Sequence, residues 1–248
     1  MNLKTRQEEI IKILNENGYA TVNYLTDKLH YSSATINRDL NELQKNGLVK
    51  RTHGGVEPIK TQYVPVQFRS HLMHTEKRKI AKLASSFVNN GDIVFIDGST
   101  TAQCMEQYLT LKKDLTVITN NMVLACNLSF AGVKTICLGG EVVEKPSMLF
   151  GVETVENASR YKVNKMFFST QAISDKGLLS AGLYDLLFKA VAKNADEIFY
   201  LVDHEKLNRP FNVIYSDLSC IDYVISDFSF PTETIEKYKT TKFIKVEE

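Results

Sequence analysis

The 248-residue sequence lacks the features of membrane and secreted proteins. No stretch approaches the roughly 20 consecutive apolar residues that are needed to span a bilayer. The first residues, Met1 to Arg6, continue directly into a polar helical pattern, without the apolar core of a secretory signal. We therefore expect a cytoplasmic protein.

Metal sites, disulfides and common cofactor motifs are also missing. The four cysteines (Cys104, Cys126, Cys137 and Cys220) are scattered among apolar neighbours and never form a Cys-x-x-Cys pair, which predicts reduced, buried thiols. Neither a Walker motif nor a dinucleotide-binding fingerprint occurs, and no Cys-His or Ser-His arrangement suggests nucleophilic catalysis. We expect no cofactor, no metal ion and no catalytic residue.

An excess of charge of one sign is absent as well. The formal net charge is +1, and residues 1–60 hold nine Lys and Arg against seven Asp and Glu, while the remainder holds 21 against 22. A two-charge excess is a weak electrostatic footprint for nucleic-acid binding. Any DNA-binding function must therefore be argued from architecture.

What is present in residues 1–57 predicts three helices followed by a β-hairpin. Apolar residues at helical spacing indicate a first helix from about Thr5 to Asn17. The second helix begins after the N-cap Thr21, and the third begins after Ser32 and ends at Gly47. Residues 48–56 are expected to pair as a short hairpin.

This order is the plan of a winged helix-turn-helix. In such a module the third helix enters the major groove, and a basic wing lies against phosphates. A winged helix that binds only protein, or a small helical oligomerisation domain, is the alternative. The predicted DNA-binding residues are Thr21, Ser32, Ser33, Thr35, Asn37, Arg38, Asn41, Lys50, Arg51, His53 and Gly54.

The third helix and the wing also resemble a known family. The segment Tyr31–Leu43, followed by Gly47-Leu48 and Arg51-Thr52-His53-Gly54-Gly55, is similar to the N-terminal signature of the DeoR family of bacterial regulators. That signature is close to V-S-x-x-T-I-R-R-D-L-x-x-L, then G-x-x-x-R-x-H-G-G. Asn37 stands where the family commonly has the first of two arginines. The resemblance implies a DNA-binding role.

The rest of the chain predicts a linker and an α/β domain. Residues 58–74 include Pro58 and Pro65 and show no sustained period, which favours an extended linker. Short apolar runs then alternate with helix-length segments over residues 75–248, which predicts a mostly parallel sheet covered on both faces. The runs are residues 93–96, 115–118, 133–138, 165–168, 198–202 and 223–225.

Polar residues and glycines collect where several of these strands end. Open α/β sheets bind ligands beyond the carboxyl ends of their strands, and free amides at a helix N-terminus favour anions. Singly, each feature has a plainer interpretation, such as a turn with an N-cap or a solvated surface lysine. The predicted effector-binding residues are Asp97, Gly98, Ser99, Thr100, Thr101, Asn120, Gly139, Gly140, Asp185, Lys189, Asp203 and Lys206.

The family resemblance extends through this half. Asp97-Gly98-Ser99-Thr100-Thr101, Thr119-Asn120, Leu138-Gly139-Gly140 with Gly151, and Asp203-x-x-Lys206 are similar to family landmarks. The resemblance implies a sensor domain related in fold to ribose-phosphate isomerases and CoA transferases, with a phosphorylated sugar as effector. Two departures concern the ligand: Asp185 replaces a common Glu before Lys189, and His204-Glu205 lies inside the Asp203–Lys206 segment.

We therefore predict a DNA-binding transcription regulator, a repressor of carbohydrate metabolism genes that a phosphorylated sugar releases from its operator. A homo-oligomer, dimer or tetramer, is expected because paired half-sites need paired recognition helices. Two alternatives stay open. One is a regulator with a vestigial sensor, and the other is a sugar-phosphate isomerase with Asp97, Asp185 or Asp203 as general base.

Overall fold

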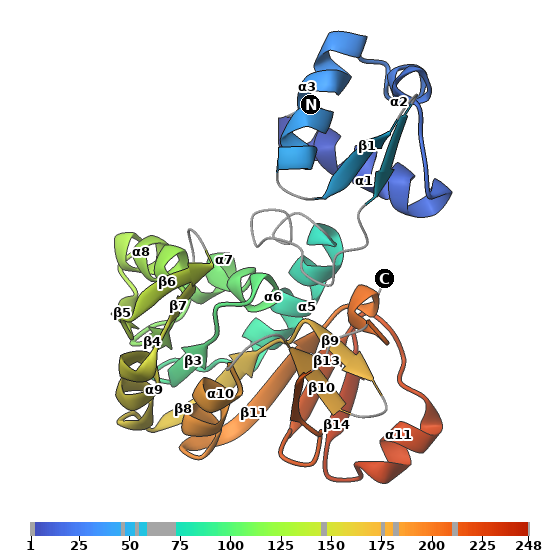
Figure 1. Ribbon diagram of the computed structural model, residues 1–248. Helices are drawn as coiled ribbons and strands as arrows, with labels where there is room; N and C mark the ends of the chain where they lie inside the picture. Colours follow the sequence, from blue (N-terminus) through green and yellow to red (C-terminus); the bar gives the residue numbers. More distant parts are fainter. Residues whose placement is uncertain are drawn as a thin grey trace. The chain divides into compact units, whose positions relative to one another are not determined.

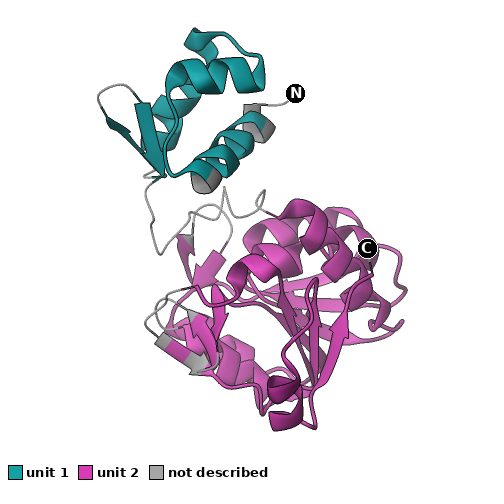
Figure 2. Cartoon of the chain, turned by 90° about the vertical axis from the view of Figure 1, so that its right-hand side faces the viewer, with its two compact units in different colours: residues 1–72 teal, residues 73–248 magenta. Residues whose placement is uncertain are grey.

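Contacts along the chain divide it into two units, residues 1–72 and 73–248 (Figure 2). The computed structural model describes residues 3–45, 48–52, 55–58, 73–144, 148–174, 177–180, 184–209 and 213–247. Most of the predicted linker, together with Gly47, His53 and Gly54, lies outside the described residues.

Three helices and a hairpin form the N-terminal unit, as predicted (Figure 1). Thr21 accepts a hydrogen bond from the Tyr24 amide at 3.1 Å, and Ser32 accepts one from the Thr35 amide at 3.3 Å, so both predicted N-caps are confirmed. Apolar side chains from every element form one buried cluster. The elements are α1 (Leu3–Asn17), α2 (Val22–Leu29), α3 (Ser33–Lys45), β1 (Val49–Thr52) and β2 (Gly55–Pro58).

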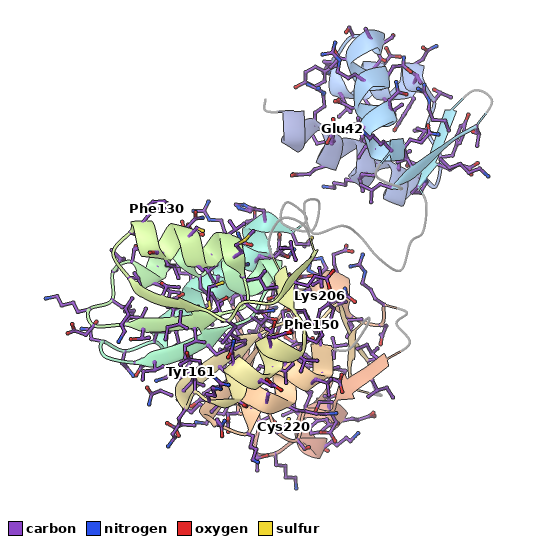
Figure 3. All side chains as sticks on the ribbon, turned by 60° about the vertical axis from the view of Figure 1, so that its left-hand side comes forward. Glu42, Phe130, Phe150, Tyr161, Lys206 and Cys220 are labelled. Atoms are coloured by element: carbon purple, nitrogen blue, oxygen red, sulfur yellow. The ribbon has the colours of Figure 1, made fainter. Side chains whose placement is uncertain are left out.

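A buried ion pair fixes α3 against α1. Arg6 donates to both carboxylate oxygens of Asp39, with 3.0 Å between Nη2 and Oδ1, and Asp39 has no exposed surface. Close by, Gln7 donates to Glu42 (labelled in Figure 3) at 2.8 Å. The side chain of Asp39 therefore serves the core of the unit and cannot reach a ligand.

Seven parallel strands form the main sheet of the second unit, in the order β14-β13-β11-β8-β3-β4-β5. The six predicted apolar runs all lie in it, and the seventh strand, β14, was not predicted. Their bounds are β3 (Ile93–Ile96), β4 (Thr116–Thr119), β5 (Lys134–Cys137), β8 (Val163–Phe168), β11 (Ala195–Val202), β13 (Tyr223–Ser226) and β14 (Lys242–Lys245).

Helices cover both faces of this sheet, so alternate residues of each strand enter different cores. On β8, Met166 and Phe168 pack with α9 and α10, whereas Phe167 packs with α5 to α8. The helices are α5 (His74–Ser86), α6 (Thr100–Gln103), α7 (Glu106–Leu109), α8 (Met122–Phe130), α9 (Val152–Ser159), α10 (Tyr184–Ala192), α11 (Thr232–Lys237) and the 3₁₀ turn η1 (His204–Lys206).

Short antiparallel strands outside the main sheet were not predicted. Two of them form a hairpin, and three form a separate small sheet in the order β12-β10-β9. Each is only three or four residues long, too short to show a period. They are β6 (Glu141–Glu144), β7 (Met148–Phe150), β9 (Ala172–Ser174), β10 (Gly177–Ser180) and β12 (Val213–Ser216).

The expectation of buried thiols is wrong for three of the four cysteines. Cys126, Cys137 and Cys220 are exposed, Cys104 is half-buried, and all four are free. Apolar sequence neighbours misled the prediction because successive residues of a strand or helix point in different directions. Within the described residues, no helix is long and apolar enough to cross a membrane.

Candidate functional site

The candidate site lies where the direction of strand connection reverses. From β3 the chain proceeds through β4 to β5 on one side, and β8, on the other side of β3, is followed by β11, β13 and β14. The carboxyl ends of β3 and β8 therefore flank a switch point, the usual ligand position in open α/β sheets. Polar residues follow both strands there: Asp97 to Thr101 after β3, and Ser169 and Thr170 after β8.

Lys206 spans this switch point (labelled in Figure 3). Its Nζ donates to Thr101 Oγ1 at 2.9 Å and to Ser169 Oγ at 2.6 Å, and it lies 3.6 Å from Asp203 Oδ2. Only 9% of the residue is exposed, which rules out the interpretation of a solvated surface lysine. The 3₁₀ turn η1 positions the side chain, and the Lys206 amide donates to the Asp203 carbonyl at 3.0 Å.

Asp97 joins the two sides of the switch point. One carboxylate oxygen accepts the Ser99 amide at 3.1 Å, and the other accepts the Ser169 amide at 3.2 Å. Burial raises the pKa of Asp97 to about 6, against the hydrogen bonds from Ser99 and Ser169 and the charge of Lys206, which lower it. The carboxyl group therefore changes charge within a mildly acidic range.

Two buried oxygens near these strand ends lack a hydrogen-bond donor. Asn120 Oδ1 and Asp203 Oδ2 are both inaccessible to solvent, and neither accepts a hydrogen bond from the described part of the chain. Asn120 itself is held by donation from Nδ2 to the Leu149 carbonyl at 3.0 Å. Buried acceptors are nearly always paired in folded proteins, so these oxygens are candidates to accept hydrogen bonds from a ligand.

At two glycines of the candidate site, Gly98 and Gly140, a side chain would overlap with neighbouring atoms. A Cβ on Gly98 would lie 2.7 Å from the Met148 side chain, and one on Gly140, where φ is +116°, would lie 2.1 Å from Thr154 Oγ1. At Gly139, where φ is +76°, the space is open. Ser99 is the N-cap of α6 and accepts a hydrogen bond from the Ala102 amide at 3.2 Å. The plainer interpretation of this loop, a turn with an N-cap, therefore also holds.

Asp185 and Lys189 are engaged with each other. Lys189 Nζ lies 2.9 Å from Asp185 Oδ2, one helical turn away on α10, and 62% of the Lys189 side chain is exposed. Their place in an effector site stays a prediction.

Three residues of the cluster were missed by sequence reasoning. Ser169 and Thr170 follow an apolar run just as Asp97 does, so the same strand-end rule would have found them. Lys77 on α5 donates to Thr100 Oγ1 at 3.2 Å and is 3% exposed. No sequence signal distinguishes it from the exposed lysines of the same helix.

The predicted DNA-binding residues of α3 line one side of that helix. Ser33, Arg38 and Asn41 are exposed, whereas Ile36, Leu40 and Leu43 are buried as predicted. Arg38 has no partner among the described residues, which leaves its guanidinium available for DNA. Lys50 on β1 is exposed.

Arg51 differs from the expectation of a wing residue that reaches outward to phosphates. Its guanidinium donates Nη1 to Asn41 Oδ1 at 2.7 Å and Nη2 to Asn37 Oδ1. Asn37 Nδ2 in turn donates to the Ser33 carbonyl at 2.8 Å. The wing arginine is therefore tied to two residues of the third helix.

No group of three or more His, Cys, Asp or Glu in the described residues could hold a metal ion. The cluster around Lys206 offers hydroxyls, amides, the two cations Lys77 and Lys206, and carboxyl groups. Such a set can bind an anion and accept hydrogen bonds from hydroxyl groups.

Comparison with known proteins identifies both units. Residues 6–62 match the model of the DeoR-like helix-turn-helix domain, and residues 72–228 match the DeoR C terminal sensor domain. The chain is 32% identical to the HTH-type transcriptional repressor GlcR of Bacillus subtilis, over 92% of this chain and 89% of the relative. It is 28% identical to the glycerol-3-phosphate regulon repressor of Escherichia coli, over 95% of each protein.

Among solved structures, ribose 5-phosphate isomerase A of Methanocaldococcus jannaschii is similar over 54% of each chain, with 19% identity and a TM-score of 0.40. With both family models matched in chain order and a repressor similar along nearly its whole length, the chain belongs to the DeoR family of DNA-binding transcription regulators.

Proposed function

We propose that this protein represses carbohydrate metabolism genes and that a phosphorylated sugar, bound at the carboxyl ends of β3 and β8, releases it from its operator. The chain is a transcription regulator and not an enzyme, so the isomerase alternative is set aside. We also propose that it acts in the cytoplasm, where a bacterial regulator meets its DNA.

One observation supports the phosphate part of the proposal most strongly. Lys206 is buried, yet its Nζ joins hydroxyls that follow two different strands at the switch point. Burying a lysine costs desolvation, yet the fold holds the Lys206 ammonium group at this point, 3.6 Å from Asp203 Oδ2. A compact cation held among hydroxyl groups at the switch point is suited to bind a phosphate group.

The proposal that the ligand is a sugar rests on two buried hydrogen-bond acceptors of the protein. Asn120 Oδ1 and Asp203 Oδ2 are buried oxygens without a donor in the described residues. Hydroxyl groups of a sugar are donors that would satisfy them. We also propose that Gly98, Thr100, Gly139 and Gly140 shape the loops around the ligand, with Asp185 and Lys189 at its border.

The regulatory step needs two binding activities in one chain. We propose that residues 1–57 bind DNA and residues 75–248 bind ligand and hold an even-numbered homo-oligomer, dimer or tetramer. For the sugar phosphate to release DNA, it must bind the DNA-free arrangement of protomers more tightly than the DNA-bound one.

The first test is thermal melting of the full chain against a panel of sugar phosphates and their unphosphorylated parents. A ligand that binds only the folded protein raises the melting temperature by mass action. We expect a shift with a phosphorylated sugar and none with its parent. No shift across the panel would favour the vestigial-sensor alternative.

A pair of substitutions then tests the division of labour. Lys206→Met should abolish the ligand-induced shift and leave operator binding intact, whereas Arg38→Ala should do the reverse. Lys193→Met, an exposed lysine at the end of α10, is the charge-matched control and should change neither. If either Lys206→Met or Arg38→Ala removed both activities in a folded protein, the two-unit model would be wrong.

A further inference from the structure

The hydrogen bonds between the wing and the third helix concern a residue that sequence reasoning had assigned to phosphate contact. Arg51 lies on β1, and its side chain is half-buried. Two of its five N–H groups go to side-chain oxygens of Asn37 and Asn41, which lie one turn apart on α3. A planar guanidinium suits two acceptors at that spacing, because its donors point in fixed directions.

These contacts fix where the positive charge lies. Asn37 is itself held by donation from Nδ2 to the Ser33 carbonyl at 2.8 Å, so Arg51, Asn37 and the backbone of the first turn of α3 form a chain of hydrogen bonds. The guanidinium is therefore held on the exposed side of α3, where Arg38 and Asn41 also lie. Its other N–H groups have no partner within the described residues.

The same contacts engage both the oxygen and the nitrogen of the Asn37 amide. To read adenine, an asparagine needs its oxygen and its NH₂ group together. In Asn37 the oxygen accepts from Arg51 and the nitrogen donates to Ser33. Asn37 is therefore occupied as a positioning residue and is a poor reader of a base.

We propose that Arg51 is a base-reading residue, held in the major groove by Asn37 and Asn41, and that it selects a guanine in each operator half-site. Arginine pairs with guanine through two parallel hydrogen bonds to O6 and N7, which is the commonest specific contact in protein–DNA complexes. The inference rests on the proposed function, since it requires α3 to lie in the major groove.

Lys50 provides a contrast within the same strand. It neighbours Arg51, but its side chain is exposed and belongs to the opposite face of β1, because successive strand residues alternate. Lys50 is thus suited to a phosphate contact, which adds affinity without sequence preference. Each of the two substitutions Arg51→Ala and Lys50→Ala removes one positive charge, so they form a matched pair.

The test is selection of binding sites by the full-length protein from a randomised double-stranded DNA library, followed by affinity measurements on the selected site and its single-base variants. Wild type should select a site in which one guanine per half-site cannot be replaced without on the order of tenfold loss of affinity. Arg51→Ala should remove the preference at that position. Lys50→Ala should weaken binding to all sites alike and keep the preference.

The positioning role has its own readout. Asn37→Ala retains every charge, so the slope of affinity against salt concentration should stay as in wild type. The discrimination at the Arg51-dependent guanine should nevertheless fall, because the guanidinium is no longer held. Thermal melting of each variant identifies any loss of folding.

The outcomes separate this inference from the proposed function. If wild type selected no sequence at all, the DNA-binding function itself would be wrong. If wild type selected a site and Arg51→Ala kept the same base preference at every position, Arg51 would be a phosphate contact and the inference would fail. An unchanged preference in Asn37→Ala would refute the positioning role.

Discussion

Single residues in this protein show two uses of a buried charge. Asp39 is fully buried and paired with Arg6 at hydrogen-bond distance, so the two charges satisfy each other inside the N-terminal core. Lys206 is also buried, and it donates to the hydroxyls of Thr101 and Ser169 and lies 3.6 Å from an Asp203 carboxylate oxygen. The first pattern is that of a structural ion pair, and the second joins residues from several strand ends, where we propose that the ligand binds.

Removing one member of the structural pair should destabilise the N-terminal unit. Asp39→Ala leaves the guanidinium of Arg6 buried without a counter-charge, which typically costs about 3–5 kcal/mol. We expect urea unfolding of this unit, followed by circular dichroism, to show a decrease of that order in the free energy of unfolding. Glu42→Ala, an exposed position one turn along α3, should cost under about 1 kcal/mol. Equal effects of the two substitutions would contradict a structural role for the buried pair.

His204, the first residue of the turn η1, makes the stability of the protein depend on pH. Burial lowers the pKa of His204, but its hydrogen bond to Asp227 and the charges of Asp227, Glu205 and Asp203 outweigh this, so the pKa lies above its usual 6.5. Because the folded pKa is the higher one, the stabilisation is fully present below pH 6.5 and is lost as the pH rises through the folded pKa.

The expected effect is modest because half of the His204 side chain is exposed. Urea unfolding at pH 6.5 and 8.5 should show a loss of roughly 0.2–1 kcal/mol that Asp227→Asn lacks. A wild type and an Asp227→Asn variant with the same pH dependence would rule out the pair as its source.

At the scale of elements, the candidate site is formed by the loops at the ends of the strands, which are harder to predict than the strands themselves. The apolar runs of β3, β4, β8 and β11 could be located in the sequence because each is a short stretch rich in branched and aromatic residues. The loop after β5 depends on backbone geometry. Gly140 has a φ of +116°, and its Cα faces Thr154, whose hydroxyl donates to the Gly139 carbonyl at 2.7 Å.

Gly140→Ala should therefore destabilise the second unit more than a glycine replacement in open space. The new Cβ would lie 2.1 Å from Thr154 Oγ1 and 3.0 Å from the Phe150 carbonyl, which adds steric overlap to the backbone strain of a positive φ. Gly132→Ala, with a φ of +82° and no atom within 4 Å, should show only the backbone cost, about 1–2 kcal/mol. Differential scanning calorimetry of both variants measures the contrast, and equal losses would show that Thr154 moves aside freely.

At the scale of the whole molecule, the two units have separate apolar cores. The cluster of the N-terminal unit draws on α1 to α3 and the hairpin, whereas two further clusters occupy the faces of the parallel sheet. Each unit therefore has the means to fold by itself, and the function we propose arises because both are joined in one chain.

The isolated N-terminal unit should be folded but a weak binder. Residues 1–72 should melt cooperatively, because their core is complete without the sheet. On the operator selected by the full chain, their affinity should be on the order of 100-fold lower, since a monomeric unit loses the linked second half-site. Fluorescence anisotropy at matched salt concentration measures the affinity of residues 1–72 and that of the full chain. An affinity equal to that of the full chain would exclude cooperation between paired units.

The sequence by itself determined the local elements of this protein. Period and capping residues located α1 to α3 and the hairpin, and apolar runs located six of the seven parallel strands, because these signals act over a few residues. The resemblance to the family signature around Arg38 and Asp39 was also visible in a short segment of the sequence. Most residues of the Lys206 cluster could be proposed in advance because strand ends are visible once the strands are.

Only the tertiary structure decided how these residues are used. Lys206 meets Thr101 at a sequence separation of 105 residues, and Arg51 turns to α3 rather than outward. The thiols of Cys126 and Cys137 are exposed although their neighbours are apolar. In each case the deciding factor is which side chains lie opposite in space, and this depends on the order and packing of the elements, which no local pattern of residues contains.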